Sequence, residues 1–226
     1  PSNMSEQAWA TAGVGMLMVT WWATQVLPIP VTSLIPIVLF PLIGISSVTE
    51  AATPYANPVI FLLLGGFIIA TALQRWQLHR RLALLVLRIA GSHPHSIIGG
   101  FMFASAFLSM WISNTATTIM MLPIAISLAQ VMLKGQSKEV TDKFTICLLL
   151  GIAYAASIGG LGTLIGTPPN AMMAAFMEET YDTNIGVAKW MTFGLPIICL
   201  LLPLAWLLLT RFIFAFDLPH NKDSIE

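Results

Sequence analysis

Small polar side chains interrupt an otherwise apolar stretch at Ser109 and at the triplet Ser113-Asn114-Thr115. Ser109 and Ser113 are four residues apart, so on a helix their hydroxyls face the same side. If the chain turns at Ser113, these hydroxyls and the backbone carbonyls are hard oxygen ligands suited to a small cation. A helix that starts near Thr115 would present free N–H groups to an anion. The alternative is that these side chains only hydrogen-bond between helices.

A second candidate element is the segment 159–170, where glycine and proline break up an apolar run. We expect Gly159 to end one half-helix and Thr167 to cap the next, with Pro168 at the first position of that half-helix. Broken helices at membrane depth point to a transporter binding site. Thr167 and Pro168 are therefore candidate substrate-binding residues. The alternative is a proline kink that binds no ligand.

Enzyme chemistry finds little support in the sequence. All ten acidic residues fall in predicted loops, chain ends or an interfacial helix, so buried carboxylates for a proton relay or an aspartyl protease are absent from the predicted spans. The motifs H-E-x-x-H and G-x-S-x-G do not occur. The glycine-rich stretch at 159–166 lacks the lysine of a phosphate-binding loop. We therefore predict that the protein is not an enzyme.

The composition indicates a membrane protein. Of the 226 residues, 57% are hydrophobic and 9% are charged, and the mean hydropathy is +0.83. Soluble domains carry about 25% charged residues, so this chain has too few to cover a water-facing surface. The net charge is zero and no basic stripe indicates a nucleic-acid partner. We predict a multi-pass protein of the cell membrane, most plausibly a bacterial inner membrane, whose partner is the lipid bilayer.

The fold class predicted from these runs is an all-α polytopic membrane protein. Within residues 1–74 we expect apolar spans at 8–27, 31–45 and 58–73. The full division comprises transmembrane spans of a scaffold at 1–74, a cytoplasmic interfacial amphipathic helix at 75–95, transport elements at 96–185 (a re-entrant helical hairpin at 96–133 and a discontinuous transmembrane helix at 144–177), a last transmembrane span at 186–216 and a cytoplasmic linker at 217–226.

The positive-inside rule tests this topology. With a re-entrant hairpin, one face carries nine basic residues and the other carries only Lys189. The nine are Arg75, Arg80, Arg81, Arg88, Lys134, Lys138, Lys143, Arg211 and Lys222. That face is predicted to be cytoplasmic. Two ordinary spans at 96–133 would give the same parity, so they remain the alternative to a hairpin.

The sequence resembles the divalent anion/sodium symporter family, whose members carry di- and tricarboxylates. The resemblance is carried by Ser113-Asn114-Thr115 on a hairpin, by Ser157-Ile158-Gly159-Gly160 and by Gly166-Thr167-Pro168-Pro169-Asn170. It covers most of the chain, from Trp21 through the last span. The motifs match the N-terminal one of two inverted repeats, so the resemblance implies that the second repeat is missing from this chain.

The resemblance also implies a site. Ser113 and Asn114 would serve both a sodium ion and a substrate carboxylate, and Thr115 would contact the substrate. Ser109 and a backbone carbonyl near Gly166 would complete the sodium shell, with Gly162 the less favoured source of that carbonyl. A partner second inverted repeat and a homodimer are expected on the same ground.

The leading functional hypothesis is sodium-coupled symport of C4-dicarboxylates (succinate, malate or fumarate) by alternating access. A sodium-independent carboxylate exchanger is the second hypothesis, and a membrane scaffold subunit that transports nothing is the third. Sodium-dependent binding of a dicarboxylate would distinguish the first from the other two.

Overall fold

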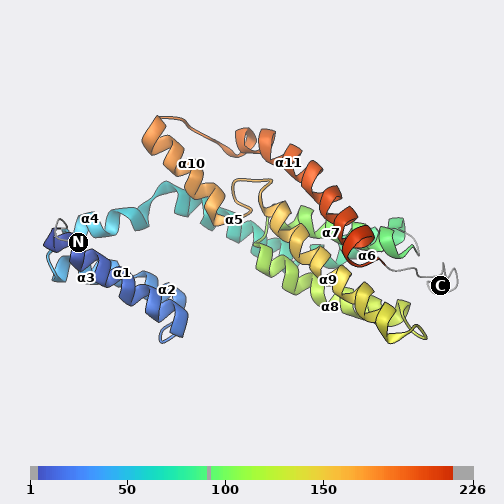
Figure 1. Ribbon diagram of the computed structural model, residues 1–226. Helices are drawn as coiled ribbons and strands as arrows, with labels where there is room; N and C mark the ends of the chain where they lie inside the picture. Colours follow the sequence, from blue (N-terminus) through green and yellow to red (C-terminus); the bar gives the residue numbers. More distant parts are fainter. Residues whose placement is uncertain (1–4, 91–92, 216–226) are drawn as a thin grey trace. The chain divides into compact units, whose positions relative to one another are not determined.

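The computed structural model describes residues 5–90 and 93–215, and every regular element within those ranges is a helix (Figure 1). The predicted all-α class is therefore confirmed for the described residues. The chain divides into two compact units, one ending at Ile60 and the other starting at Phe61. The predicted linker at 217–226 lies outside the described residues.

The first unit consists of short helices that follow one long one. Its elements are α1 (Glu6–Thr24), α2 (Ile29–Ser33), α3 (Ile35–Leu42), α4 (Val48–Ala52) and the 3₁₀ turn η1 (Thr53–Ala56). Ser5 caps α1, because its side chain accepts a hydrogen bond from the backbone N–H of Ala8. Ser47 and Glu50 form a capping box at the start of α4, and the donated backbone hydrogen bond from Ser47 is the main reason that the pKa of Glu50 is lowered.

The predicted span at 31–45 forms as two short helices in place of one. Pro36 has no N–H to donate to the carbonyl of Thr32, so the hydrogen-bond ladder is interrupted near Leu34. The N–H of Ile37 donates to the carbonyl of Leu34, and the carbonyl of Ser33 accepts the hydroxyl of Tyr55 at 2.6 Å. The sequence showed the prolines, but it did not show that Tyr55 would bond the carbonyl of Ser33.

The second unit begins within α5 (Pro58–Arg75) and contains the remaining helices. Gln77, in the left-handed region with φ 51°, turns the chain sharply from α5 into the next helix. The following elements are α6 (Leu78–Ala90), α7 (Pro94–Ser109), α8 (Asn114–Met132), α9 (Lys138–Gly160), α10 (Pro168–Tyr181), α11 (Val187–Leu207) and the π-helical turn η2 (Leu208–Ile213). The predicted helix at 75–95, the hairpin arms, the helix break and the last span thus all have helical counterparts.

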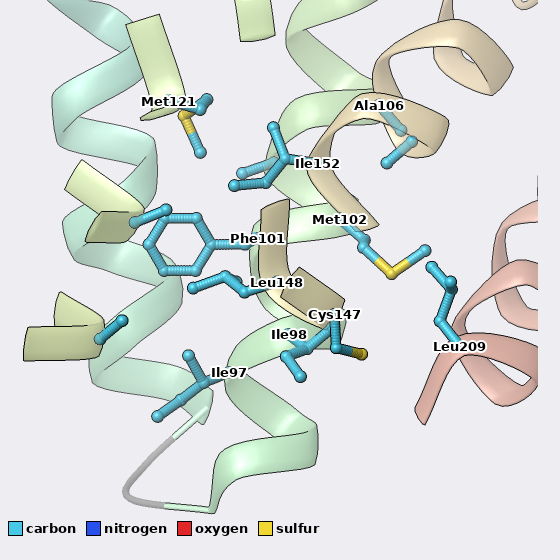
Figure 2. Close-up of a cluster of buried hydrophobic side chains, with 14 of the residues drawn as sticks. Ile97, Ile98, Phe101, Met102, Ala106, Met121, Cys147, Leu148, Ile152 and Leu209 are labelled. Atoms are coloured by element: carbon cyan, nitrogen blue, oxygen red, sulfur yellow. The ribbon is translucent and has the colours of Figure 1, made fainter. Parts of the chain in front are cut away.

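The core of the second unit lies where α7 and α8 pack against α9. Figure 2 shows its centre, in which Phe101 and Met102 of α7 meet Met121 of α8 and Leu148 and Ile152 of α9. These five side chains are at most 1% exposed. Burying large apolar side chains of this kind stabilises each by about 1.5–3 kcal/mol relative to exposure in water, and it fixes the three helices as one packed group.

Small residues let α7 and α9 approach closely. A Cβ atom added to Gly159 would lie 2.2 Å from the carbonyl oxygen of Ala106, and one added to Gly151 would lie 3.1 Å from Cγ of Met102. Small residues spaced along one helix face are a common way for membrane helices to bring their backbones together. The contact at Gly159 places the end of α9 directly beside the end of α7.

Four helices among the described residues are long and apolar enough to cross a membrane: α5, α8, α9 and the continuous stretch of α11 and η2. The predicted first span is a 19-residue helix, α1, but it is not one of the four. The 16 residues of α7 are too few to be counted. That α7 and α8 re-enter the same side of the membrane therefore stays a prediction.

Candidate functional site

The turn between α7 and α8 carries the Ser-Asn-Thr triplet. Ser113 is the N-cap of α8, and its hydroxyl accepts a hydrogen bond from the backbone N–H of Ala116 at 3.3 Å. Asn114 is the first helical residue, so the helix starts one residue before the predicted Thr115. Ser113 and Thr115 are exposed, whereas Asn114 is half-buried. The first N–H groups of this helix have no acceptor within it, and they offer an anion a partial positive charge.

Ser109 lies at the centre of a cluster of oxygen atoms. Its hydroxyl oxygen is fully buried and lies 2.6 Å from Oδ1 of Asn114 and 2.6 Å from the carbonyl oxygen of Ala156. The three oxygens come from α7, α8 and α9, and the hydroxyl, which has one proton, can donate to only one of the other two. Hard oxygen ligands that converge in this way suit a small cation.

Glycine at position 160 makes room for Asn114. A Cβ atom at Gly160 would lie 2.5 Å from Oδ1 of Asn114, closer than side-chain atoms approach one another. Gly166 in turn makes room for Gly160, since a Cβ atom at Gly166 would lie 2.5 Å from the carbonyl oxygen of Gly160. Asn114, Gly160 and Gly166 are therefore stacked against one another, which brings the hairpin tip to the helix break.

Side chains from three elements hold the break between α9 and α10. Nδ2 of Asn170 lies 2.8 Å from the carbonyl oxygens of both Gly160 and Thr163, and Nε1 of Trp190 donates to the carbonyl of Leu161 at 2.9 Å. The hydroxyl of Thr163 donates to the carbonyl of Met110 at the end of α7. Carbonyls at the end of a helix have no partner within it, so these donors satisfy groups that the break would leave unpaired at membrane depth.

The cap predicted at Thr167 is wrong in one respect. Thr167 does occupy the N-cap position of α10, with extended backbone and Pro168 following it, but its side chain makes no capping hydrogen bond. The backbone N–H of Asn170, the usual partner of such a cap, donates to the carbonyl of Thr167 at 3.1 Å. The hydroxyl of Thr167 is therefore not held by the helix that it precedes.

The structure brings most of the predicted site residues together. Ser109 and Asn114 are in contact, and Gly160 connects Asn114 to the predicted Gly166. Thr115, Thr167 and Pro168 lie at the N-terminal ends of α8 and α10, at the edges of this group. None of the contacts described above involves an ionisable side chain, so within the described residues the electrostatics of the site come from helix ends and carbonyl dipoles.

Four groups at the site were not among the predicted site residues: the carbonyl of Ala156, Gly160, Thr163 and Asn170; Gly160 and Asn170 appeared only within the motifs that carry the family resemblance. The carbonyl has no signal in the sequence, because every residue has one. Asn170 had one: it is an amide side chain in a proline- and glycine-rich segment at membrane depth, and such a side chain needs partners. It is 5% exposed in the structure.

The unpartnered hydroxyls of Ser105 and Thr117 extend the polar group into the core. Both are fully buried, and neither Oγ of Ser105 nor Oγ1 of Thr117 has a hydrogen-bond partner among the residues that the structure describes. Ser105 is one turn before Ser109 on α7, and Thr117 is one turn after Asn114 on α8. Both hydroxyls therefore lie one turn away from the oxygen cluster.

Comparison with known proteins gives consistent matches. Residues 19–223 match the model of the citrate transporter family. The chain is 40% identical over 233 residues to a protein named sodium-dependent dicarboxylate transporter SdcS from Staphylococcus saprophyticus, and the match covers 100% of this chain and 45% of that protein. Proteins of the same name from Staphylococcus aureus strains bovine RF122 / ET3-1 and USA300 are 39% identical over 224 residues, covering 97% of this chain and 43% of theirs. The chain thus spans about half the length of the curated relatives that it matches.

Proposed function

The chain belongs to the citrate transporter family, and from this we propose that it forms one half of a sodium-coupled carrier of C4-dicarboxylates such as succinate, malate and fumarate. The names of its relatives, sodium-dependent dicarboxylate transporters, support the ion and the substrate class. The protein is a multi-pass membrane protein, its relatives are bacterial, and a bacterial inner membrane is part of the proposal.

The observation that carries the proposal is the oxygen cluster at Ser109. Two carbonyl oxygens lie 2.6 Å from one hydroxyl, and a single proton cannot serve both of them. A sodium ion that takes Ser109, Asn114 and the carbonyl of Ala156 as ligands would remove this deficit. Ser113 and the backbone near Gly166 are the proposed remaining ligands.

The dicarboxylate is proposed to bind at the adjacent helix ends. Ser113, Asn114 and Thr115 begin α8, and Thr167 and Pro168 begin α10, so two positive helix ends contribute to this part of the site. The described contacts here include no lysine or arginine, which makes bound sodium the remaining source of positive charge. This arrangement favours sodium binding before the substrate.

A second, inverted repeat of the full-length protein is proposed to complete the site. Binding sites of inverted-repeat carriers lie where the two repeats meet, and transport follows from rocking one part against the other. The full-length carrier is proposed to act as a homodimer. The 226-residue chain by itself would therefore not transport.

The test is succinate binding and uptake by the full-length protein in sodium and in choline buffers. We expect uptake to require sodium. Equal succinate binding in both buffers would contradict the symport hypothesis and favour sodium-independent exchange. Asn114→Asp is the diagnostic variant, because it keeps the shape of the side chain but adds a negative charge. Two unit charges about 4 Å apart repel by about 4 kcal/mol at an effective dielectric of about 20, and even a quarter of that is about fivefold in affinity.

The Asp variant should therefore bind succinate less tightly by fivefold or more, while its sodium affinity falls less or rises. Asn114→Ala should weaken both, since it removes the oxygen as well as the donor. Asn184→Asp is the matched control, because Asn184 lies in an exposed loop where it bonds Glu178. Undiminished succinate affinity in folded Asn114→Asp protein would remove the hairpin tip from the anion site.

A further inference from the structure

The surface around α6 is basic. No acidic residue occurs between Glu50 and Glu139, an interval that includes all of α5 to α8. Arg75, Arg80, Arg81 and Arg88 are exposed, and none of them forms an ion pair with any residue that the structure describes. Four exposed guanidinium groups with no carboxylate partner attract an anion from outside the chain.

The arginines of α6 are placed along an apolar stripe. Leu82, Leu85 and Ile89 share one helical face, and Arg81 and Arg88, seven residues apart, lie together at its flank. Leu82 is half-buried against the core, whereas Leu85 is 52% and Ile89 is 77% exposed. The stripe is therefore only partly covered by the described chain, and its uncovered part lies beside two arginines.

A cavity of about 340 Å³ lies between this stripe and α7. Its walls are formed by Leu82, Leu85 and Ile89 on one side and by Gly100, Phe103 and Phe107 on the other. Ser96 is the one polar residue among those that line it. Gly100 has no side chain to fill the space, and Phe103 is 62% exposed. A cavity with such walls does not hold ordered water, because water needs polar partners.

We propose that this cavity binds an acyl chain of an anionic phospholipid, whose phosphate group pairs with Arg81 and Arg88. The cavity supplies the apolar half of such a site and the flanking arginines supply the other half. Guanidinium groups bind phosphate through paired hydrogen bonds. The net positive charge of the surrounding surface favours a lipid with net negative charge over a zwitterionic one, whose ammonium group would be repelled. The proposal depends on the membrane location and not on the sodium site.

The experiment uses purified full-length protein in detergent, titrated with phosphatidylglycerol or with phosphatidylcholine of the same acyl chains, and bound lipid is counted by native mass spectrometry. We expect a preference for phosphatidylglycerol. Each arginine near a lipid phosphate contributes about fivefold in affinity, so the double variant Arg81→Gln/Arg88→Gln should lose about 25-fold for phosphatidylglycerol. Its binding of phosphatidylcholine should fall by less, because the ammonium group of that lipid already weakens its attraction to the basic surface.

Two further variants complete the test. Gly100→Leu fills the cavity from α7 and should reduce binding of both lipids, which a purely electrostatic surface effect would not do. Lys189→Gln removes a positive charge outside this surface and should change neither. Equal binding of the two lipids by the unaltered protein overturns the proposal, as does an unchanged lipid count in Gly100→Leu. The latter result would mean that another part of the full-length protein, or a second copy, fills the cavity.

Discussion

Replacing Gly160 by Ala tests whether Asn114 is held in place by the end of α9. The new Cβ would lie 2.5 Å from Oδ1 of Asn114, whereas ordinary contacts begin at 3.4 Å, so the two atoms overlap by 0.9 Å (3.4 − 2.5). Oδ1 is at the far end of a side chain, so Asn114 moves more easily than the backbone of α9. A 2.6 Å contact lengthened by this amount exceeds the hydrogen-bond range of about 3.2 Å, so we expect the shift to break the contact between Asn114 and Ser109.

The expected effect is a selective loss of sodium affinity. Leaving one buried polar group without its partner costs about 1–3 kcal/mol, which corresponds to a loss of about fivefold to 150-fold. The assay is the sodium dependence of succinate uptake by the full-length protein in proteoliposomes, together with a thermal unfolding curve to score folding. The half-saturating sodium concentration should rise by at least fivefold.

Gly65→Ala is the matched control. Gly65 lies within α5 and a Cβ there meets nothing within 4 Å, so this change should leave sodium dependence unaltered. Alanine in a helix interior is favoured over glycine by up to about 1 kcal/mol, so the control should be slightly more stable. If Gly160→Ala protein folds normally and keeps its sodium dependence, the position of Asn114 does not matter for the cation and the proposed ligand set is wrong.

Four other changes have definite expected outcomes. Asn170→Ala removes the donor to the carbonyls of Gly160 and Thr163, so sodium affinity should fall by fivefold or more. The control Asn184→Ala should have no effect. Equal shifts of the unfolding temperature and unchanged uptake in both variants would refute the role of Asn170. Ser109→Ala removes the central oxygen and should abolish sodium dependence without preventing membrane insertion, and normal sodium titration would exclude Ser109 as a ligand. Trp190→Phe leaves the carbonyl of Leu161 without its donor, so the free energy of unfolding should fall by about 1–3 kcal/mol. Substrate affinity should change by a smaller free energy than this. The 226-residue chain reconstituted alone should show no uptake in liposomes, and any sodium-driven accumulation by it would show that one half suffices.

Local patterns predicted the helices around the site well. The amphipathic helix predicted within 75–95 has its counterpart in α6, which runs from Leu78 to Ala90. The start of α8 at Asn114 and the end of α9 at Gly160 also lie within a residue of the predicted Thr115 and Gly159. Caps and breaks are local features, because the residues that make them are within four positions of one another.

Long-range contacts were not predictable from the same patterns. Thr163 and Met110 are 53 residues apart in the chain, and Ser109 and Ala156 are 47 apart, so only the packing of α7 on α9 brings them together. The predicted capping bond of Thr167 failed for a local reason: its expected partner, the N–H of Asn170, had a competing acceptor in the carbonyl of Thr167 itself. Residue types give the possible donors and acceptors, but the fold decides which of them meet.

The touching backbones of Gly159 and Ala106 have a mechanical consequence. A one-residue slip of α7 along α9 is a translation of about 1.5 Å, and it would bring a larger neighbour such as Phe107 toward the space that only a missing side chain leaves open. The close packing therefore prevents the ends of α7 and α9 from sliding past each other, and we expect the two helices to move as one rigid unit during a transport cycle. A disulfide engineered between α7 and α9 should therefore leave transport intact, and the flexing that exposes the site to each side of the membrane must occur outside this pair.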